Sequence, residues 1–133
     1  IFNSSKSILS KKIDDISLTN LEYENGVSGH IFHSWLNPFK EHKIVIVGSK
    51  AMLVFEDSHH DKPLTLYNKN FKYEKNAIVK NDGEIRSINY TKKMPLTEQL
   101  KSFIMANPND RINKADGTYA LDVIKILVDA SKD

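Results

Sequence analysis

The segment from Asn25 to Lys50 restricts the possible folds of this chain more than any other part of its sequence. It opens with Asn25-Gly26, a pair that tolerates the positive φ values of a type I′ turn and therefore predicts a hairpin. It closes with a second turn at Gly48-Ser49-Lys50. In the strands expected between these turns, apolar side chains alternate onto both faces. Such a sheet needs cover on each face, because large exposed apolar patches mark contact surfaces.

Alternating apolar residues and turn residues predict short strands over the first two thirds of the chain. The expected strands cover residues 16–24, 27–36, 43–47, 51–56, 64–67, 71–79 and 84–90, after an opening strand within 1–12 that runs into a loop. Asn37-Pro38 interrupts the series, because proline cannot donate a hydrogen bond to a ladder. Asp82-Gly83 is expected to form the last hairpin turn.

Two helices are expected at the end of the chain. The first runs from about Pro95, a residue suited to an early helical position, to Ala106. The segment 107–110 ends it. The second starts near Asp116, a plausible N-cap, and runs to about Ser131.

These elements predict a single α+β domain over residues 1–133, with an open, mostly antiparallel sheet of about six strands. The two helices are expected to lie on one face of the sheet. Burial stabilises a fold by about 25 cal/mol per Å² of apolar area, so it would be energetically unfavourable to leave the second face of the sheet exposed to water. We therefore expect the other face to be covered by another copy of the chain, most simply about a twofold axis.

Composition excludes several classes of function. The net charge is +2 and the two arginines, Arg86 and Arg111, stand far apart, which argues against nucleic-acid binding. The absence of cysteine excludes disulfides and thiol catalysis, and fits a cytoplasmic protein. No apolar run approaches the ~20 residues that cross a membrane. The chain begins at Ile1, which fits processing of the N-terminus or, alternatively, a domain excised from a longer protein.

Histidine and carboxylate clusters are better explained by structure than by chemistry. His59-His60 with Asp57 and Asp61 is a candidate metal site, but a solvated loop is favoured and no metal is expected. Asp14-Asp15 is expected to flank a turn.

His30 and His33 fall on opposite faces of the same expected strand, so they cannot act as a simple pair. His33 shares its face with Trp35 and is favoured as a packed histidine. A small self-contained enzyme using His33 and Glu41 is a further hypothesis, which turnover lost on His33→Ala would support.

The candidate substrate-binding residues are Trp35, Lys40 and Glu41, which surround the Asn37-Pro38 break. Loops held by a rigid scaffold often bind ligands, and a lysine beside an aromatic ring suits a phosphate or a sugar. The alternative is a solvent-exposed ion pair beside a buried tryptophan. No glycine-rich phosphate cradle is present, and no residue is expected to be catalytic or to bind a cofactor.

Four sequence runs resemble one known family. They are NGVSGHIFHSWLNPFKE, IVIVGSKAMLVFED, MPLTEQLKSFI and ADGTYALDVIKIL. Together they resemble the C-terminal domain of the Gfo/Idh/MocA oxidoreductases, in particular the sugar-nucleotide dehydrogenases of the UDP-N-acetylglucosamine or UDP-N-acetylglucosaminuronate 3-dehydrogenase kind. The resemblance covers Asp14 to Ala130, and it departs from the family at Ala51, where many relatives have glycine.

The resemblance implies a larger enzyme. Its relatives have an N-terminal Rossmann domain that binds NAD or NADP, and a C-terminal sheet domain that shapes the sugar pocket and mediates dimers or tetramers. The family's catalytic lysine and its Asp/His pair have no counterpart in this chain. The implied partners are therefore an N-terminal Rossmann domain, a nucleotide-sugar substrate and further copies of the chain. The alternative is a non-catalytic binding or assembly module that has no Rossmann partner.

Overall fold

The structure is a computed structural model that describes residues 1–106 and 116–131. Seven strands precede two helices, and every strand pair in the described residues is antiparallel. The chain is therefore α+β, as the sequence predicts. It divides into two compact units, one formed by Ile1–Asn37 with Lys93–Asp133 and the other by Pro38–Lys92.

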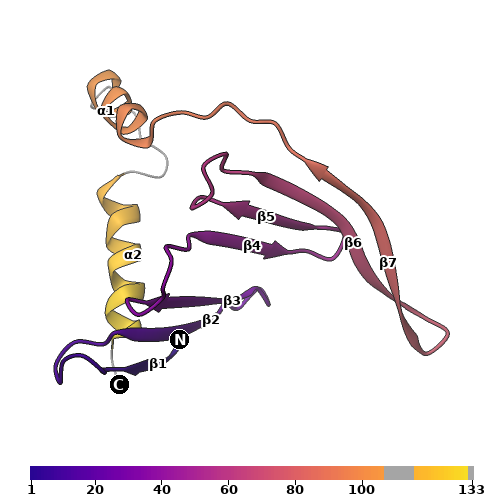
Figure 1. The fold of residues 1–133 in the computed structure, drawn as a ribbon, viewed down its shortest axis with the longest axis horizontal. Coiled ribbons are helices and arrows are strands. Elements are labelled where there is room, and N and C mark those ends of the chain that lie inside the picture. The colour runs from indigo at the N-terminus through magenta and orange to yellow at the C-terminus, as the bar shows by residue number, and fades with distance from the viewer. Residues whose placement is uncertain (107–115, 132–133) are drawn as a thin grey trace. The chain divides into compact units, whose positions relative to one another are not determined.

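The first unit contains a three-stranded sheet in the order β1-β2-β3 (Figure 1). Its strands are β1 (Phe2–Lys6), β2 (Ile16–Glu22) and β3 (Ser28–Ser34). The predicted hairpin at Asn25-Gly26 is confirmed, but Gly26 alone of the two has a positive φ, +80°. The Gly26 N–H donates to the Tyr23 carbonyl at 2.9 Å. The connection is thus a three-residue loop with glycine in the left-handed region, and not a type I′ turn.

The loop between β1 and β2 is held by two neighbouring carboxylates. Asp15 Oδ2 accepts the backbone N–H groups of Ile8 and Leu9, both at 2.7 Å. The Asp14 carboxylate accepts the hydroxyls of Ser5 and Ser7 at 2.6 and 2.8 Å. Both carboxylates therefore stabilise the loop that precedes β2, which agrees with the structural interpretation that the sequence favours.

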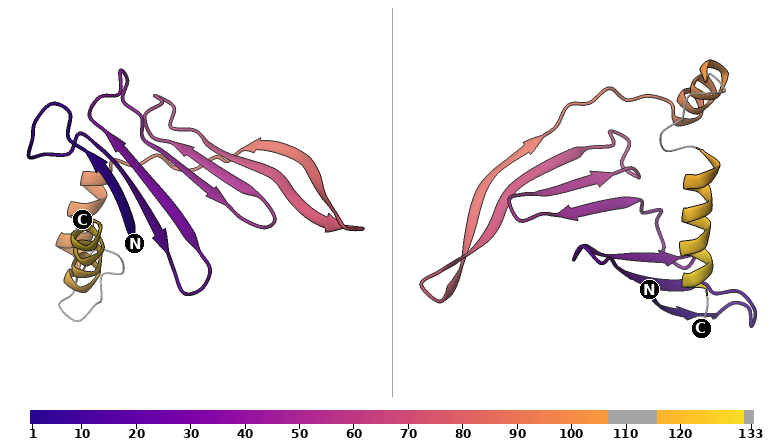
Figure 2. Two further views of the ribbon diagram at one scale, coloured as in Figure 1. Left: turned by 90° about the horizontal axis from the view of Figure 1, so that it is seen from below. Right: turned by 180° about the vertical axis from the view of Figure 1, so that it is seen from behind.

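The second unit is a four-stranded sheet in the order β4-β5-β6-β7. Its strands are β4 (Lys43–Val47), β5 (Met52–Glu56), β6 (Leu64–Glu74) and β7 (Ala77–Ser87). Strand β5 pairs with β6 only over residues 64–67. The outer parts of β6 and β7, residues 69–74 and 77–82, pair with each other and project past β4 and β5 (Figures 1 and 2). We call this two-stranded projection the arm.

The structure corrects the predicted turn in this region. The hairpin turns at Lys75-Asn76, whose φ angles are +48° and +64°, and Glu74 pairs with Ala77 across it. The strand predicted over 71–79 is therefore two strands. Gly83 lies instead at a register shift opposite Asn68, where a β-bulge accommodates one extra residue.

The predicted single sheet of about six strands is also different in the structure, where seven strands form one sheet of three and one of four. Strands β3 and β4 are not neighbours in either sheet. The segment between them, residues 35–42, contains Pro38, which lacks the N–H that a ladder requires.

The two helices lie close to where the sequence predicts them. They are α1 (Pro95–Met105) and α2 (Gly117–Ala130). Asp116 is the N-cap of α2, because its Oδ1 accepts the Tyr119 N–H at 2.7 Å. The predicted terminator of α1, residues 107–110, lies outside the described residues. Neither helix is long and apolar enough to span a membrane.

Apolar side chains of the described residues range from partly to largely exposed. Among residues 1–106 and 116–131, no hydrophobic residue is buried, and the buried polar ones are Asp15 and Thr19. The helices contribute no buried residue, so the expectation that they cover one sheet face stays a prediction. Strand β4 exposes apolar side chains on both faces, as the sequence predicts.

Candidate functional site

The predicted substrate-binding residues flank Pro38, at the boundary between the two units. Trp35 follows β3 directly, and its backbone N–H donates to the Asp15 carbonyl at 2.9 Å. Its side chain is 83% exposed, more than any other large hydrophobic residue described. The tryptophan is therefore not buried, contrary to the alternative interpretation of this segment. A fixed backbone with a bare indole ring suits stacking on a flat ligand.

Lys40 and Glu41 belong to the second unit, in the segment that leads into β4. Both side chains are exposed. Glu41 helps to raise the pKa of Lys43, although the main cause is the hydrogen bond from Lys43 to Glu56. The structure thus assigns Trp35 to one unit and the charged pair to the other. The substrate role of all three residues stays a prediction.

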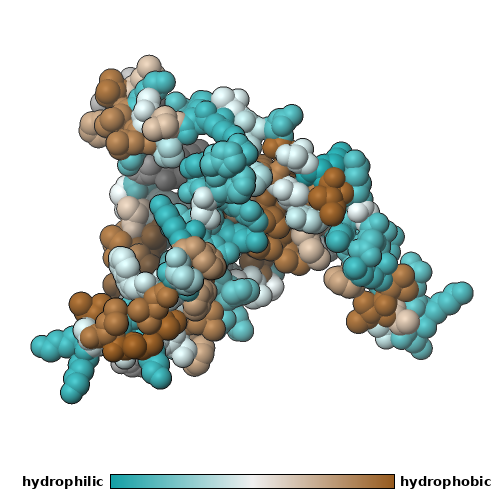
Figure 3. All heavy atoms as spheres, viewed as in Figure 1, coloured by the Kyte–Doolittle hydropathy of each residue, from teal (hydrophilic) through white to brown (hydrophobic). Residues whose placement is uncertain are grey.

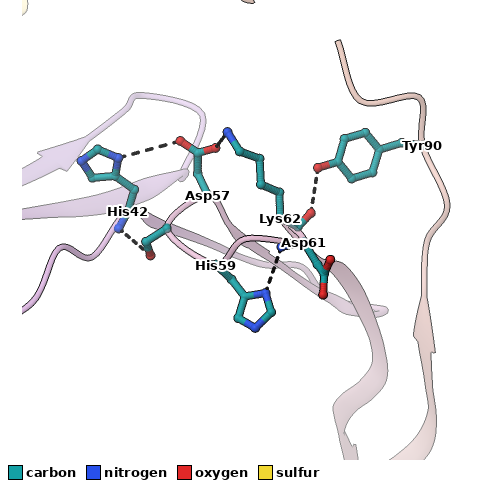
Figure 4. A network of polar contacts seen from close by, with 7 residues as sticks. His42, Asp57, His59, Asp61, Lys62 and Tyr90 are labelled. Atoms are coloured by element: carbon teal, nitrogen blue, oxygen red, sulfur yellow. Dashed lines mark hydrogen bonds and ion pairs between the residues drawn. The ribbon is translucent and has the colours of Figure 1, made fainter. Parts of the chain in front are cut away.

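A polar network orders the connection between β5 and β6 (Figure 4). Lys62 Nζ donates to Asp57 Oδ1 at 2.5 Å, and Asp57 Oδ2 lies 3.8 Å from Nδ1 of His42. The Lys62 hydrogen bond lowers the pKa of Asp57, and the same contact raises the pKa of Lys62. The Tyr90 hydroxyl donates to the Lys62 carbonyl at 2.7 Å. These contacts fix the loop from several sides.

The same connection brings His59, His60 and Asp61 together. One ligand atom from each lies within 4.8 Å of the others, and the two imidazole rings are 4.7 Å apart. The two adjacent imidazoles therefore lie side by side in this loop. His59 Nδ1 accepts the Asp61 N–H at 3.2 Å, and His60 Nε2 lies 3.0 Å from Asp61 Oδ2. All three residues are exposed and already contact one another, which fits the favoured interpretation as a solvated loop.

His30 and His33 stand on opposite faces of β3, as expected. Their cross-strand partners in β2 are Asn20 and Ser17, which differ by an odd number of positions. The two imidazoles therefore cannot form a pair on one face of the sheet.

The four-stranded sheet offers a further candidate surface, and its two faces carry different sets of apolar residues. The pairing register assigns each residue to a face, because side chains alternate along a strand. One face, which we call the extended face, carries Val45, Val47, Met52, Val54, Tyr67, Ile85, Phe71, Tyr73 and Ile78. The other, the short face, carries Ile44, Ile46, Leu53, Phe55, Leu64 and Leu66.

Apolar residues of the extended face continue along the arm, whereas the continuation of the short face on the arm is mostly polar, with Val79 and Ala77 as its apolar members. Phe71, Tyr73 and Ile78 place apolar side chains on the arm, and Figure 3 shows a hydrophobic patch over its outer part. The sequence interpretation missed this surface because it placed the turn at Asp82-Gly83. Apolar and polar residues alternate on both sides of Lys75-Asn76, and this pattern could have indicated a hairpin with its turn at these two residues.

Comparisons with protein families, with curated proteins and with solved structures found no match to this chain.

Proposed function

We propose that this chain is the C-terminal domain of an NAD(P)-dependent oxidoreductase that acts on a sugar or nucleotide-sugar. The observation that carries the proposal is the run from Asn25 to Glu41, in which a hairpin leads into Ser34-Trp35-Leu36, Pro38 and the charged pair Lys40-Glu41. The exposed indole at the end of that hairpin supports a role in binding a ring. The antiparallel strands followed by two helices are compatible with the implied domain.

In this proposal the chain shapes the substrate pocket and the oligomer interface, and it does not hold the cofactor. A dinucleotide site needs a strand, a glycine-rich turn and a helix in a parallel sheet. The described strand pairs are all antiparallel, and the sequence has no G-x-G-x-x-G run. The residues of this chain therefore do not fit NAD or NADP, and we assign the cofactor to a separate Rossmann domain of the parent protein.

The gene gives the first test of this proposal. We expect the reading frame upstream of Ile1 to encode a strand, a G-x-G-x-x-G turn and a helix. A frame that starts close to Ile1 without this pattern would favour the alternative, a non-catalytic binding or assembly module.

The second test uses Trp35, the single tryptophan of this chain. In the full protein, titration with UDP-N-acetylglucosamine should quench the emission of Trp35, because a ligand stacked on the exposed indole changes its surroundings. The signal should disappear in Trp35→Phe, and binding should weaken severalfold in Lys40→Ala. Lys50→Ala, a change at another exposed lysine, is the matched control. Quenching that is equal in Lys40→Ala and Lys50→Ala would remove Lys40 from the site.

A further inference from the structure

The connection between β5 and β6 brings three side chains that can bind a metal ion into one tight turn. His59, His60 and Asp61 are consecutive, and the Lys62 N–H donates to the His59 carbonyl at 2.9 Å, which closes the turn. One ligand atom from each of the three side chains lies within 4.8 Å of the other two. Consecutive side chains in a strand point to opposite faces, which argues against such a group. The turn removes that objection, because it lets neighbouring side chains converge.

The closest two ligand atoms have nearly the spacing of neighbouring ligands on one ion. His60 Nε2 lies 3.0 Å from Asp61 Oδ2. Zinc binds imidazole nitrogen and carboxylate oxygen at about 2.0–2.2 Å in a tetrahedral arrangement, so neighbouring ligand atoms stand about 3.3 Å apart. An ion bound by both atoms therefore requires little movement of either side chain.

His59 must give up one contact to become the third ligand. Its Nδ1 accepts the Asp61 N–H at 3.2 Å, so the acceptor nitrogen of the neutral ring is in use. The cluster is exposed, so water can replace this hydrogen bond at little net change in free energy. The His59 ring already lies beside that of His60, with centroids 4.7 Å apart. A rotation of the His59 side chain is therefore enough to complete the set.

Contacts outside the cluster hold this connection in place (Figure 4). Ser58 Oγ accepts the His42 N–H at 3.1 Å, and the Asp57 N–H donates to the His42 carbonyl at 2.8 Å. On the other side of the cluster, the Tyr90 hydroxyl donates to the Lys62 carbonyl. The backbone on both sides of the ligands is thus fixed by groups that a metal ion would leave in place.

The donor set favours a transition metal over a hard cation. Two imidazoles and one carboxylate suit Zn²⁺, whereas Mg²⁺ and Ca²⁺ prefer oxygen ligands. The lysine next to the cluster, Lys62, is paired with Asp57, which reduces its repulsion of a cation. Three protein ligands leave the fourth tetrahedral position to water.

We propose that His59, His60 and Asp61 form a binding site for one zinc ion per chain. The site lies entirely within the second unit, so it does not depend on how the two units are arranged. It goes beyond the proposed function and does not rest on it. A chain without a Rossmann partner would retain the site.

Calorimetric titration of the full chain, without an affinity tag, with zinc chloride tests the site. Two double variants are compared, each of which removes two of the five histidines. His59→Ala/His60→Ala should weaken zinc binding about tenfold or more, because even the loss of a ligand's hydrogen-bonding partner has an effect of this size. His30→Ala/His33→Ala in β3 should leave binding near the parent value. Asp61→Asn keeps the size of the side chain and should weaken binding through the lost charge.

Imidazole proton signals in NMR spectra locate the ion without relying on variants. Zinc should shift the ring signals of His59 and His60 and leave those of His30 and His33 in place. Magnesium chloride at the same concentration should shift none of them, because Mg²⁺ takes oxygen ligands.

Any of four results would overturn the proposal. They are no heat of binding at the highest soluble zinc concentration, equal weakening by the two double variants, full binding by Asp61→Asn, and equal responses to zinc and magnesium.

Discussion

At the residue scale, the two described side chains that are buried are polar. Asp15 is 8% exposed, and its Oδ2 accepts two backbone N–H groups of the β1–β2 loop. Thr19 is 9% exposed, and its hydroxyl donates to Asn3 Oδ1 at 2.9 Å. Through these hydrogen bonds the two side chains stabilise the first sheet and its β1–β2 loop.

Asp15→Ala should destabilise the first sheet by about 1–3 kcal/mol, because it leaves two backbone donors without their acceptor. Asp14→Ala is the matched control, since that exposed carboxylate accepts only side-chain hydroxyls. Urea unfolding followed by circular dichroism measures both variants. Equal losses in the two would contradict the role assigned to Asp15.

The Asp57–Lys62 contact predicts a pH dependence of the β5–β6 connection. The pKa of Asp57 is lowered, so its contribution to stability is complete above the unfolded value near ~3.9 and is lost as pH falls through the folded value. The pKa of Lys62 is raised, so its contribution is present below about 10.4 and is lost as pH rises through the folded value.

Lys62→Met should return the pKa of Asp57 toward its usual range, because it removes the main stabilising partner of the carboxylate. Carboxyl chemical shifts in an NMR titration report this directly. Lys72→Met, at a lysine outside the network, should leave the Asp57 titration unchanged. An unshifted titration in Lys62→Met would show that the contact is absent in solution.

At the element scale, β6 and β7 determine the character of the second unit. They are the longest strands described, at 11 residues each, and their outer halves pair only with each other. Two backbone positions set this geometry. Asn76 adopts a left-handed conformation that asparagine tolerates, and Gly83 allows the close approach of Asn68 at the bulge.

Gly83→Ala should destabilise the arm by about 1–3 kcal/mol, because the added Cβ would overlap the carbonyl oxygen of Asn68 and lie 2.9 Å from its Cβ. Hydrogen exchange of the arm amides should accelerate, while β4–β5 amides change less. Gly29→Ala in β3 is the control, since its Cβ would meet nothing within 4 Å. Unchanged exchange in the arm would refute the steric role of Gly83.

At the scale of the whole molecule, many large hydrophobic side chains remain accessible to solvent in both units. No hydrophobic residue among those described is buried. Stability should therefore depend on association, because a partner that binds only the folded state shifts the folding equilibrium.

The melting temperature should consequently rise with protein concentration, by about 2–4 °C for each tenfold increase. Differential scanning calorimetry over a dilution series measures it, and the dye ANS should bind more strongly as the protein is diluted. A melting temperature independent of concentration in the parent chain would show that this chain folds without a partner.

The sequence by itself determined the elements that local chemistry specifies. The alternation of side chains predicted the exact bounds of β4. Pro95 and the N-cap Asp116 located the starts of the two helices, and Asn25-Gly26 indicated a hairpin. The same alternation showed that β4 is apolar on both faces. Of the candidate site residues, the sequence pointed to Trp35 but did not indicate its exposure.

Only the tertiary structure decided which segments pair. Lys75-Asn76 and Asp82-Gly83 are both acceptable turn sequences, and the choice between them depends on whether Phe71 lies opposite Lys80 across the arm. The division into two sheets and the separation of an extended face from a short one follow from the same pairing. Register is a property of two strands distant in sequence, so no local pattern in either one fixes it.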